Sequence, residues 1–400
     1  MSQANRTTKL NKDAKLLLVS QSASFMGDYC VLPAILILAT YYGNYWVVSG
    51  VLVVRSIPMI FQPFLGVFVD KFERKVIMFW TDIIRGLCFL ALFFLPEGEF
   101  PLLFLGLLFV SYASGVFFNP ARLSLMANLG VDVKRINTLF ALATTLCIIF
   151  GASFGALFLF LMGSVKAAVL FNALSYLLPA ALVLMIKAES PKIDSVGFRA
   201  HMQSFKRGLL EIKGNAYVRN AVYLMMTMAT MCGVAYSFYP SVSEGFIDGE
   251  VGNFILTVAL GVGGFIGAKS VERWGFQSQV GITLFYILSL ASILCFIYSP
   301  TFMFAMLAAT VFYMAMEFGE VIAKVRVHES TTNDIQGRIF AVSEALIGLC
   351  LSLGALFINL FSLPVIAGII GLMIIALAVQ SRSLRHMTDK EQHSGSAPGV

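Results

Sequence analysis

About twelve apolar segments, each roughly 20 residues long, limit what this sequence can fold into more than any other feature. A helix of about 20 residues spans the hydrocarbon core of a bilayer, which is about 30 Å thick. Lipid cannot hydrogen-bond the backbone, and an α-helix satisfies its own polar groups within one segment. The sequence therefore predicts an all-α membrane protein with about twelve transmembrane helices.

The predicted helices fall into two groups of six. The first group is Ala14–Thr40, Tyr45–Val69, Val76–Leu95, Pro101–Met126, Ile136–Met162 and Ala167–Ile186, and the second is Val218–Ser241, Val251–Val271, Val280–Tyr298, Thr301–Val325, Ile339–Leu360 and Pro364–Val379. Secondary transporters are often built from two such halves, which rock against each other. We expect an N-terminal tail at 1–13, a six-helix bundle at 14–186, a polar linker at 187–217, a second six-helix bundle at 218–380 and a tail at 381–400.

Charge distribution predicts the orientation in the membrane. With an even helix count, the Lys and Arg residues of the tails, the linker and several short loops fall on one side, and only Lys166 falls on the other. Short cytoplasmic loops carry the Lys and Arg excess. We therefore expect a multi-pass protein of the cell inner membrane with both termini in the cytoplasm. The net charge of +6 then reflects topology, and no nucleic-acid partner is expected.

Cofactor, metal and enzyme chemistry find no support in the sequence. The six cysteines fall inside apolar segments without C-x-x-C spacing, no histidine pair has zinc-site spacing, and no phosphate-binding loop is evident. Gly151-Ala-Ser153-Phe-Gly155 matches the hydrolase pattern G-x-S-x-G, but it lies inside a predicted membrane helix. Small residues at this spacing favour helix packing instead. We expect neither a cofactor nor an enzyme.

A basic loop between the second and third predicted helices reads Gly66-Val-Phe-Val-Asp70-Lys71-Phe-Glu73-Arg74-Lys75. The glycine permits close helix contact, the aspartate can accept hydrogen bonds from a helix N-terminus, and the basic side chains can contact anionic lipid. Gly66, Asp70, Lys71, Arg74 and Lys75 are therefore candidates for a gating loop that holds the two halves together. The alternative is a basic loop that only sets topology.

This loop resembles the signature G-x-x-x-D-[RK]-x-x-R-[RK] of the major facilitator superfamily. Other short motifs are similar to the branch that contains the enterobactin exporter and macrolide-efflux proteins: Arg55-Ser-Ile-Pro58, Phe118-Asn-Pro120-Ala121-Arg122, Asn137 and Gly337-Arg338-Ile-Phe340. Phe25-Met26-Gly27-Asp28 is also similar to lysophospholipid transporters. The resemblance implies the major facilitator fold and transport by alternating access.

Two ionisable residues lie near the middle of predicted helices, Asp28 in the first and Arg55 in the second. A charge inside the membrane is costly, so such residues usually face a cavity or each other. Asp28 is our first candidate for proton coupling or substrate contact, because a carboxylate can gain and lose a proton whereas an arginine stays charged. A static Asp28–Arg55 ion pair is the alternative.

Further charged candidates lie in the third, tenth and eleventh predicted helices. Asp82 and Arg85 are three residues apart, so we expect a local ion pair. Glu317 and Glu320 also share a helix face, and either one of them holds a proton or both form a latch to nearby basic residues. Glu344 is a further proton-coupling or substrate candidate, and the secondary candidates also include Arg122 and Arg338.

Flexible and aromatic side chains mark a candidate cavity. Met225 and Met228 in the seventh predicted helix, with Tyr313 and Met314 in the tenth, would give a deformable lining for bulky amphipathic substrates. Ordinary packing against lipid or other helices is the alternative.

These observations predict a secondary active transporter, most simply a monomeric, proton-coupled exporter of amphipathic small molecules that contacts membrane lipids. A lysophospholipid flippase, a metal-ion exporter and a regulatory membrane protein without transport activity are the alternatives that the sequence leaves open.

Overall fold

The computed structural model describes residues 10–43, 45–127, 129, 131, 133–187, 198–245, 249–274 and 279–394. The helices are α1 (Lys12–Thr40), α2 (Tyr45–Lys71), α3 (Arg74–Phe94), α4 (Pro101–Ala127), α5 (Val133–Met162), α6 (Lys166–Ser175), α7 (Leu177–Leu184), α8 (Phe198–Gly214), α9 (Ala216–Glu244), α10 (Gly249–Trp274), α11 (Gln279–Ile297), α12 (Phe302–Glu329), α13 (Asn333–Leu360) and α14 (Leu363–Ser394).

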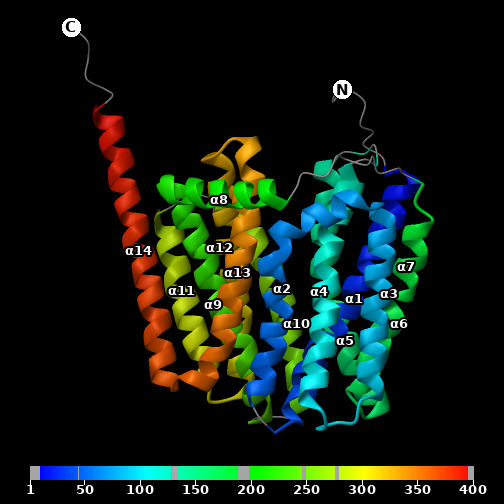
Figure 1. Ribbon diagram of the computed structural model, residues 1–400. Helices are drawn as coiled ribbons and strands as arrows, with labels where there is room; N and C mark the ends of the chain where they lie inside the picture. Colours follow the sequence, from blue (N-terminus) through cyan, green and yellow to red (C-terminus); the bar gives the residue numbers. More distant parts are fainter. Residues whose placement is uncertain are drawn as a thin grey trace.

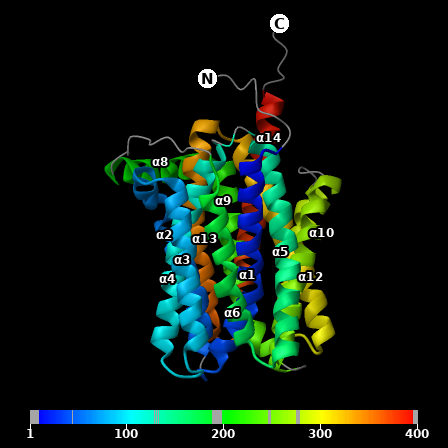
Figure 2. The same cartoon turned by 90° about the vertical axis from the view of Figure 1, so that its right-hand side faces the viewer.

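Within the described ranges, 11 helices are long and apolar enough to cross a membrane, and α11 contributes the shorter apolar stretch Phe285–Ile297. Figure 1 shows these helices running side by side as one bundle, while α8 lies across one end. A view from the side places α8 across the same end, which we call the α8 end (Figure 2). The predicted all-α membrane fold is confirmed.

The segment between the two groups of helices, which the sequence identified as a polar linker, contains a helix. Residues Phe198–Gly214 form the helix α8, whose Phe205 ring lies 5.1 Å from the ring of Phe64 in α2. Gly208 faces the backbone of Arg338 in α13, where an added Cβ would come within 3.0 Å of the Arg338 carbonyl oxygen. The linker thus packs on both halves of the bundle, α1–α7 and α9–α14.

A break in the sixth membrane-spanning segment shapes the interior of the first half. Pro179 has no N–H to donate to the carbonyl of Ser175, and the segment is divided at Tyr176 into α6 and α7. Ser20 of α1 donates a hydrogen bond to the Pro179 carbonyl over 3.4 Å. The break places the fully buried Tyr176 side chain against α1 and α3.

Two helix pairs form the largest contacts between the halves, α2 with α13 and α5 with α10. At Gly348 of α13, an added Cβ would lie 2.8 Å from the Ser56 carbonyl oxygen, and at Gly261 of α10 it would lie 2.6 Å from the Ile149 side chain. Glycine thus allows the backbones to approach closely, as is common between membrane helices. Gly151 and Gly155 also pack tightly, against α1 backbone oxygens, which supports helix packing as their role.

We predict that Gly354→Ala destabilises the protein by about 1–3 kcal/mol, because the new Cβ would lie 2.1 Å from the Thr230 carbonyl oxygen and force α9 and α13 apart. Gly106→Ala is the matched control, since nothing lies within 4 Å of a Cβ at that helical site. Thermal unfolding in detergent should show a lower midpoint for Gly354→Ala and an unchanged or higher one for Gly106→Ala. Equal midpoints would contradict the close-packing interpretation.

Candidate functional site

A cavity of about 330 Å³ lies between α2, α9, α12 and α13, where the two halves of the bundle meet. Its walls are mainly apolar and include the flexible side chains of Met59, Met225, Met228 and Met316. A lining of this kind adapts to different apolar shapes. The cavity can therefore accept the hydrophobic part of a small molecule.

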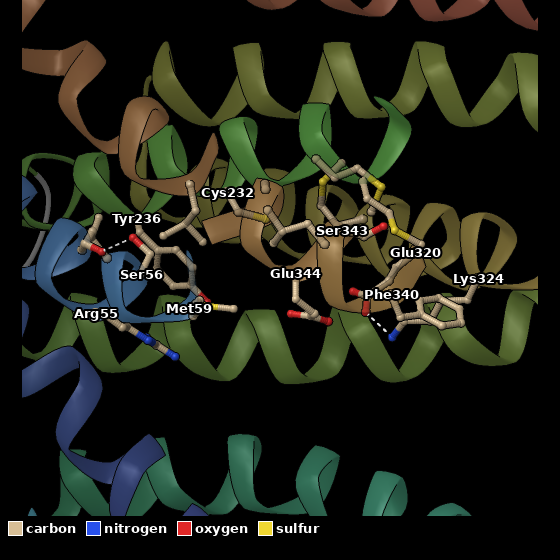
Figure 3. A pocket seen from close by; sticks show the side chains of 17 residues that line it. Arg55, Ser56, Met59, Cys232, Tyr236, Glu320, Lys324, Phe340, Ser343 and Glu344 are labelled. Atoms are coloured by element: carbon tan, nitrogen blue, oxygen red, sulfur yellow. Dashed lines mark hydrogen bonds and ion pairs between the residues drawn. The ribbon is translucent and has the colours of Figure 1, made fainter. Parts of the chain in front are cut away.

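Charged side chains follow one another along this cavity, as Figure 3 shows. Arg55 from α2 lies at one end and Glu344 from α13 lies nearer the middle. Glu320 and Lys324 from α12 lie at the other end, with 2.5 Å between the Lys324 Nζ and a Glu320 carboxylate oxygen. Their side chains are 46% and 50% exposed, so this end of the cavity reaches the surface near the α8 end. The cavity thus presents both signs of charge beside apolar walls.

The halves are hydrogen-bonded to each other at the end opposite α8. Tyr41 donates to Glu250, Ser241 donates to Tyr45 over 3.1 Å, and Asn359 donates to Ser49 over 2.7 Å. Tyr41, Tyr45 and Ser49 belong to the first half, in α2 or the turn before it. Their partners Glu250, Ser241 and Asn359 belong to α10, α9 and α13 of the second half. These bonds close the bundle below the cavity.

Asp28 is bound in the interior of the first half. The Arg85 Nη2 atom lies 2.9 Å from both carboxylate oxygens of Asp28, and the Tyr176 hydroxyl donates to the same carboxylate. The Arg85 guanidinium carbon also lies 4.5 Å from the centre of the Tyr176 ring. We call Asp28, Arg85 and Tyr176 the Asp28 cluster. The charges of Asp28 and Arg85 compensate each other, and the Tyr176 hydroxyl also binds the carboxylate.

This arrangement corrects two expectations from the sequence. Asp28 pairs with Arg85 in α3, and not with Arg55. Asp82 is fully buried, and neither of its carboxylate oxygens has a hydrogen-bond partner among the described residues, so the expected Asp82–Arg85 pair is absent there. Arg85 lies near both carboxylates, and Asp28 binds it because α1 presents its oxygens directly to the guanidinium.

Arg55 has aromatic surroundings that sequence reasoning missed. The hydroxyl groups of Tyr29, Tyr112 and Tyr236 lie within electrostatic range of its charge, as does Asp28. These tyrosines come from α1, α4 and α9. No local motif distinguishes these three from the other tyrosines among the 13 of the chain. Tyr176 was missed for the same reason.

Some of the remaining acidic and cavity candidates line the cavity, and the others pack between helices. Met225 and Met228 line the cavity, whereas Tyr313 is buried against Tyr239, which donates a 2.7 Å hydrogen bond to it. Met314 packs by its backbone against Gly267 of α10. Glu317 also faces α10, because a Cβ added at Gly267 would lie 3.0 Å from the Glu317 Cβ. Glu317 is not part of the cavity wall.

Gly66, Asp70 and Lys71 of the predicted gating loop belong to the last turns of α2, and the side chains of Asp70 and Lys71 lie outside the described residues. Arg74 is fully buried at the start of α3, and its Nη1 donates to the Phe72 carbonyl over 3.2 Å. Lys75 donates to the Ile186 carbonyl over 3.2 Å, which connects α3 to the end of α7.

Two arginines among the secondary candidates lie apart from the cavity wall. The Arg122 guanidinium lies 5.2 Å from the centre of the Phe140 ring, so it connects α4 to α5 by a cation–π contact. Arg338 is half-buried on α13 beside α8.

Residues 17–355 match the family model of the Major Facilitator Superfamily. The chain belongs to this superfamily. It is 56% identical over 374 residues to the proposed bacilysin exporter BacE of Bacillus subtilis (strain 168), covering 94% of this chain and 95% of that relative. The corresponding protein of Bacillus amyloliquefaciens is 55% identical with the same coverage.

Solved structures of major facilitator proteins share the fold at low identity. The nucleoside transporter NupG is 12% identical, covers 92% of this chain and 99% of its own, and has a TM-score of 0.72. A POT family transporter in complex with 5-aminolevulinic acid is 9% identical, covers 94% of this chain and 96% of its own, and has a TM-score of 0.71. The chain is therefore a transporter, not an enzyme, and its relatives connect it with efflux.

We predict that Arg85, and not Arg55, is energetically coupled to Asp28. Replacing one partner of a buried pair leaves the other uncompensated, so Arg85→Ala combined with Asp28→Asn should recover about 0.5–3 kcal/mol relative to the sum of the single losses. Arg55→Ala combined with Asp28→Asn is the control and should be additive within about 0.5 kcal/mol. Thermal unfolding of the five variants and the parent measures both cycles. A larger coupling for Arg55 would contradict the observed pairing.

Proposed function

We propose that this chain is a proton-coupled exporter of a small amphipathic molecule, which works as a monomer in the cell inner membrane by alternating access. The observation that carries the proposal is the cavity between the halves, whose apolar walls hold Arg55, Glu344 and the Glu320–Lys324 pair. Apolar pockets with a few placed charges bind molecules that have both characters. The similarity to proposed bacilysin exporters supports outward movement and makes bacilysin the first substrate to test.

The basic loops support a cytoplasmic α8 end, because short cytoplasmic segments carry the Lys and Arg excess. Both termini would then also be cytoplasmic. The hydrogen bonds at the opposite end, such as Ser241 to Tyr45, hold the bundle closed toward the outside. Export would require these bonds to break while the α8 end closes, which moves one half against the other.

The first test uses purified protein in vesicles, with the α8 end facing the outer solution and the vesicle interior acidified. Bacilysin should accumulate inside as protons leave, and Glu344→Gln and Arg55→Ala should each lower the initial rate at least several-fold because each removes a charge from the cavity. Glu99→Gln is the control, since this exposed loop residue lies away from the cavity. If the parent protein moves no bacilysin, or moves it equally without a pH gradient, this function is wrong.

A lysophospholipid flippase is the second candidate, and one feature favours it. An apolar groove of about 560 Å³ lies between α1, α5, α6 and α7, lined by Val19, Phe171 and Leu178 among others. The Val19 and Leu178 side chains are half exposed, so an acyl chain could enter from the lipid side. Movement of a lysolipid in the same vesicles without a pH gradient, together with no bacilysin transport, would select this function.

We further expect the segment from Gly66 to Lys75, which covers the end of α2 and the start of α3, to act as the gate. Asp70→Asn removes a charge with little change of size, so it should lower the rate of bacilysin transport while leaving membrane insertion and the unfolding midpoint unchanged. Glu73→Gln is the control, because Glu73 is half exposed and pairs only with Lys75 at 3.2 Å among the described residues. A parental transport rate in Asp70→Asn would show that the loop only sets topology.

A further inference from the structure

Asp82 is a fully buried carboxyl group that the proposed transport cycle leaves without a role. It is 0% exposed, and neither of its oxygens has a hydrogen-bond partner among the described residues. The two donors of the Asp28 cluster, Arg85 and Tyr176, are directed at Asp28 instead. A buried carboxylate without a donor is far less stable than the neutral acid. Burial without a donor thus favours the neutral acid form of Asp82 in this conformation.

Arg85 is placed to serve either carboxyl group. It follows Asp82 by three residues, so the two side chains lie on one face of α3, while the Asp28 carboxylate approaches from α1. Its Nη2 donates to Asp28, but its buried Nε has no partner among the described residues. The charged groups within electrostatic range of Asp82 are Arg85 and Asp28, and the Tyr176 phenol is also in range. A small movement of the guanidinium would therefore exchange one carboxylate partner for the other.

We propose that Asp28 and Asp82 form a two-carboxyl proton relay around Arg85, in which Arg85 pairs with whichever of the two is ionised. In the present state Asp28 is ionised and Asp82 is neutral. When a proton binds an Asp28 oxygen, Arg85 leaves it and moves to Asp82, whose O–H bond breaks and releases a proton to water. One proton enters and one leaves, and the cluster stays neutral in both states. The relay rests on the proposed proton coupling and assigns it to specific groups.

Buried polar atoms mark a route for the released proton. Ser24 and Gln21 lie four and seven residues before Asp28 on the same face of α1, and the Ser24 Oγ and Gln21 Oε1 are buried without partners among the described residues. Such atoms are usually satisfied by water. Because α1 and α3 both begin at the α8 end, Gln21, Ser24 and Asp82 all lie on the α8 side of the Asp28–Arg85 pair.

Asp28 has a different access from Asp82. Its side chain is 26% exposed, and it lies within electrostatic range of Arg55, which lines the cavity. Asp28 would therefore exchange its proton with the cavity, and Asp82 with the water route toward the α8 end. Separate access of the two groups gives the relay a direction.

Infrared difference spectroscopy in H2O and D2O tests the relay without any substrate. At neutral pH the parent protein should show the carbonyl absorption of a protonated aspartate, identified by its shift with isotopically labelled aspartate, and Asp82→Asn should lose this absorption. Asp28→Asn should lose the same absorption although Asp82 is still present, because Arg85 would then pair with Asp82 and ionise it. Glu73→Gln is the control and should keep it, since that side chain is half exposed.

Two results would overturn the relay. If the absorption persists in Asp82→Asn, Asp82 is not the protonated group, and if it persists in Asp28→Asn, Arg85 does not exchange partners. Parent protein with isotopically labelled aspartate guards against misfolded variants, because the absorption must shift with that label. A carbonyl absorption that does not shift belongs to glutamate, and the relay is overturned if no carbonyl absorption shifts with the label.

A transport measurement separates the relay from the broader function. In the bacilysin vesicles, Asp82→Asn should abolish accumulation driven by the pH gradient but retain exchange of internal for external bacilysin at equal pH. Accumulation at the parental level would overturn the relay while leaving proton-coupled export in place. Absence of transport in the parent protein would instead remove the proposed function, and the infrared result would still decide how Asp28, Asp82 and Arg85 share their proton.

Discussion

Every charge inside this bundle has to be compensated by another group of the bundle, because lipid offers neither counter-ions nor hydrogen bonds. The Asp28–Arg85 pair, held by Tyr176, is the clearest case. It sits where α1, α3 and the α6–α7 break meet, and the break itself follows from Pro179. A proline in the sixth membrane segment thus helps to create a site where one arginine lies near the partly buried Asp28 and the fully buried Asp82.

The second charged region differs because it belongs to both halves. Arg55 comes from the first half, whereas Glu320, Lys324 and Glu344 come from the second. Movement of one half against the other would therefore change the distance between these charges, while the Asp28 cluster would move as a unit. Tyr29 and Tyr112 lie within electrostatic range of both Arg55 and Asp28, so the two regions are close enough to influence each other. This division suits a transporter in which proton binding and substrate binding occupy separate places.

The similar proteins show how little of the sequence the fold requires. NupG shares the architecture at 12% identity, so most side chains can change while the fold is kept. The glycines at helix crossings illustrate the physical demand, since Gly354 and Gly348 lie where a Cβ would collide with a backbone oxygen. The 56% identity to BacE is far higher than the 12% identity to NupG and extends over 94% of this chain. It therefore carries information about function as well as fold.

The sequence by itself determined the number of spans, the long connection after the sixth span and the choice of Asp28 and Arg55 as residues that need an explanation. Hydropathy and charge are local quantities, and lipid imposes the same conditions on every span, so these properties can be obtained from the chain alone. Only the tertiary structure decided which charge meets which. Asp28 and Arg85 are 57 residues apart, and Tyr176 is 148 residues from Asp28. The rotation of each helix about its axis brings them together, and that rotation depends on packing across several helices at once.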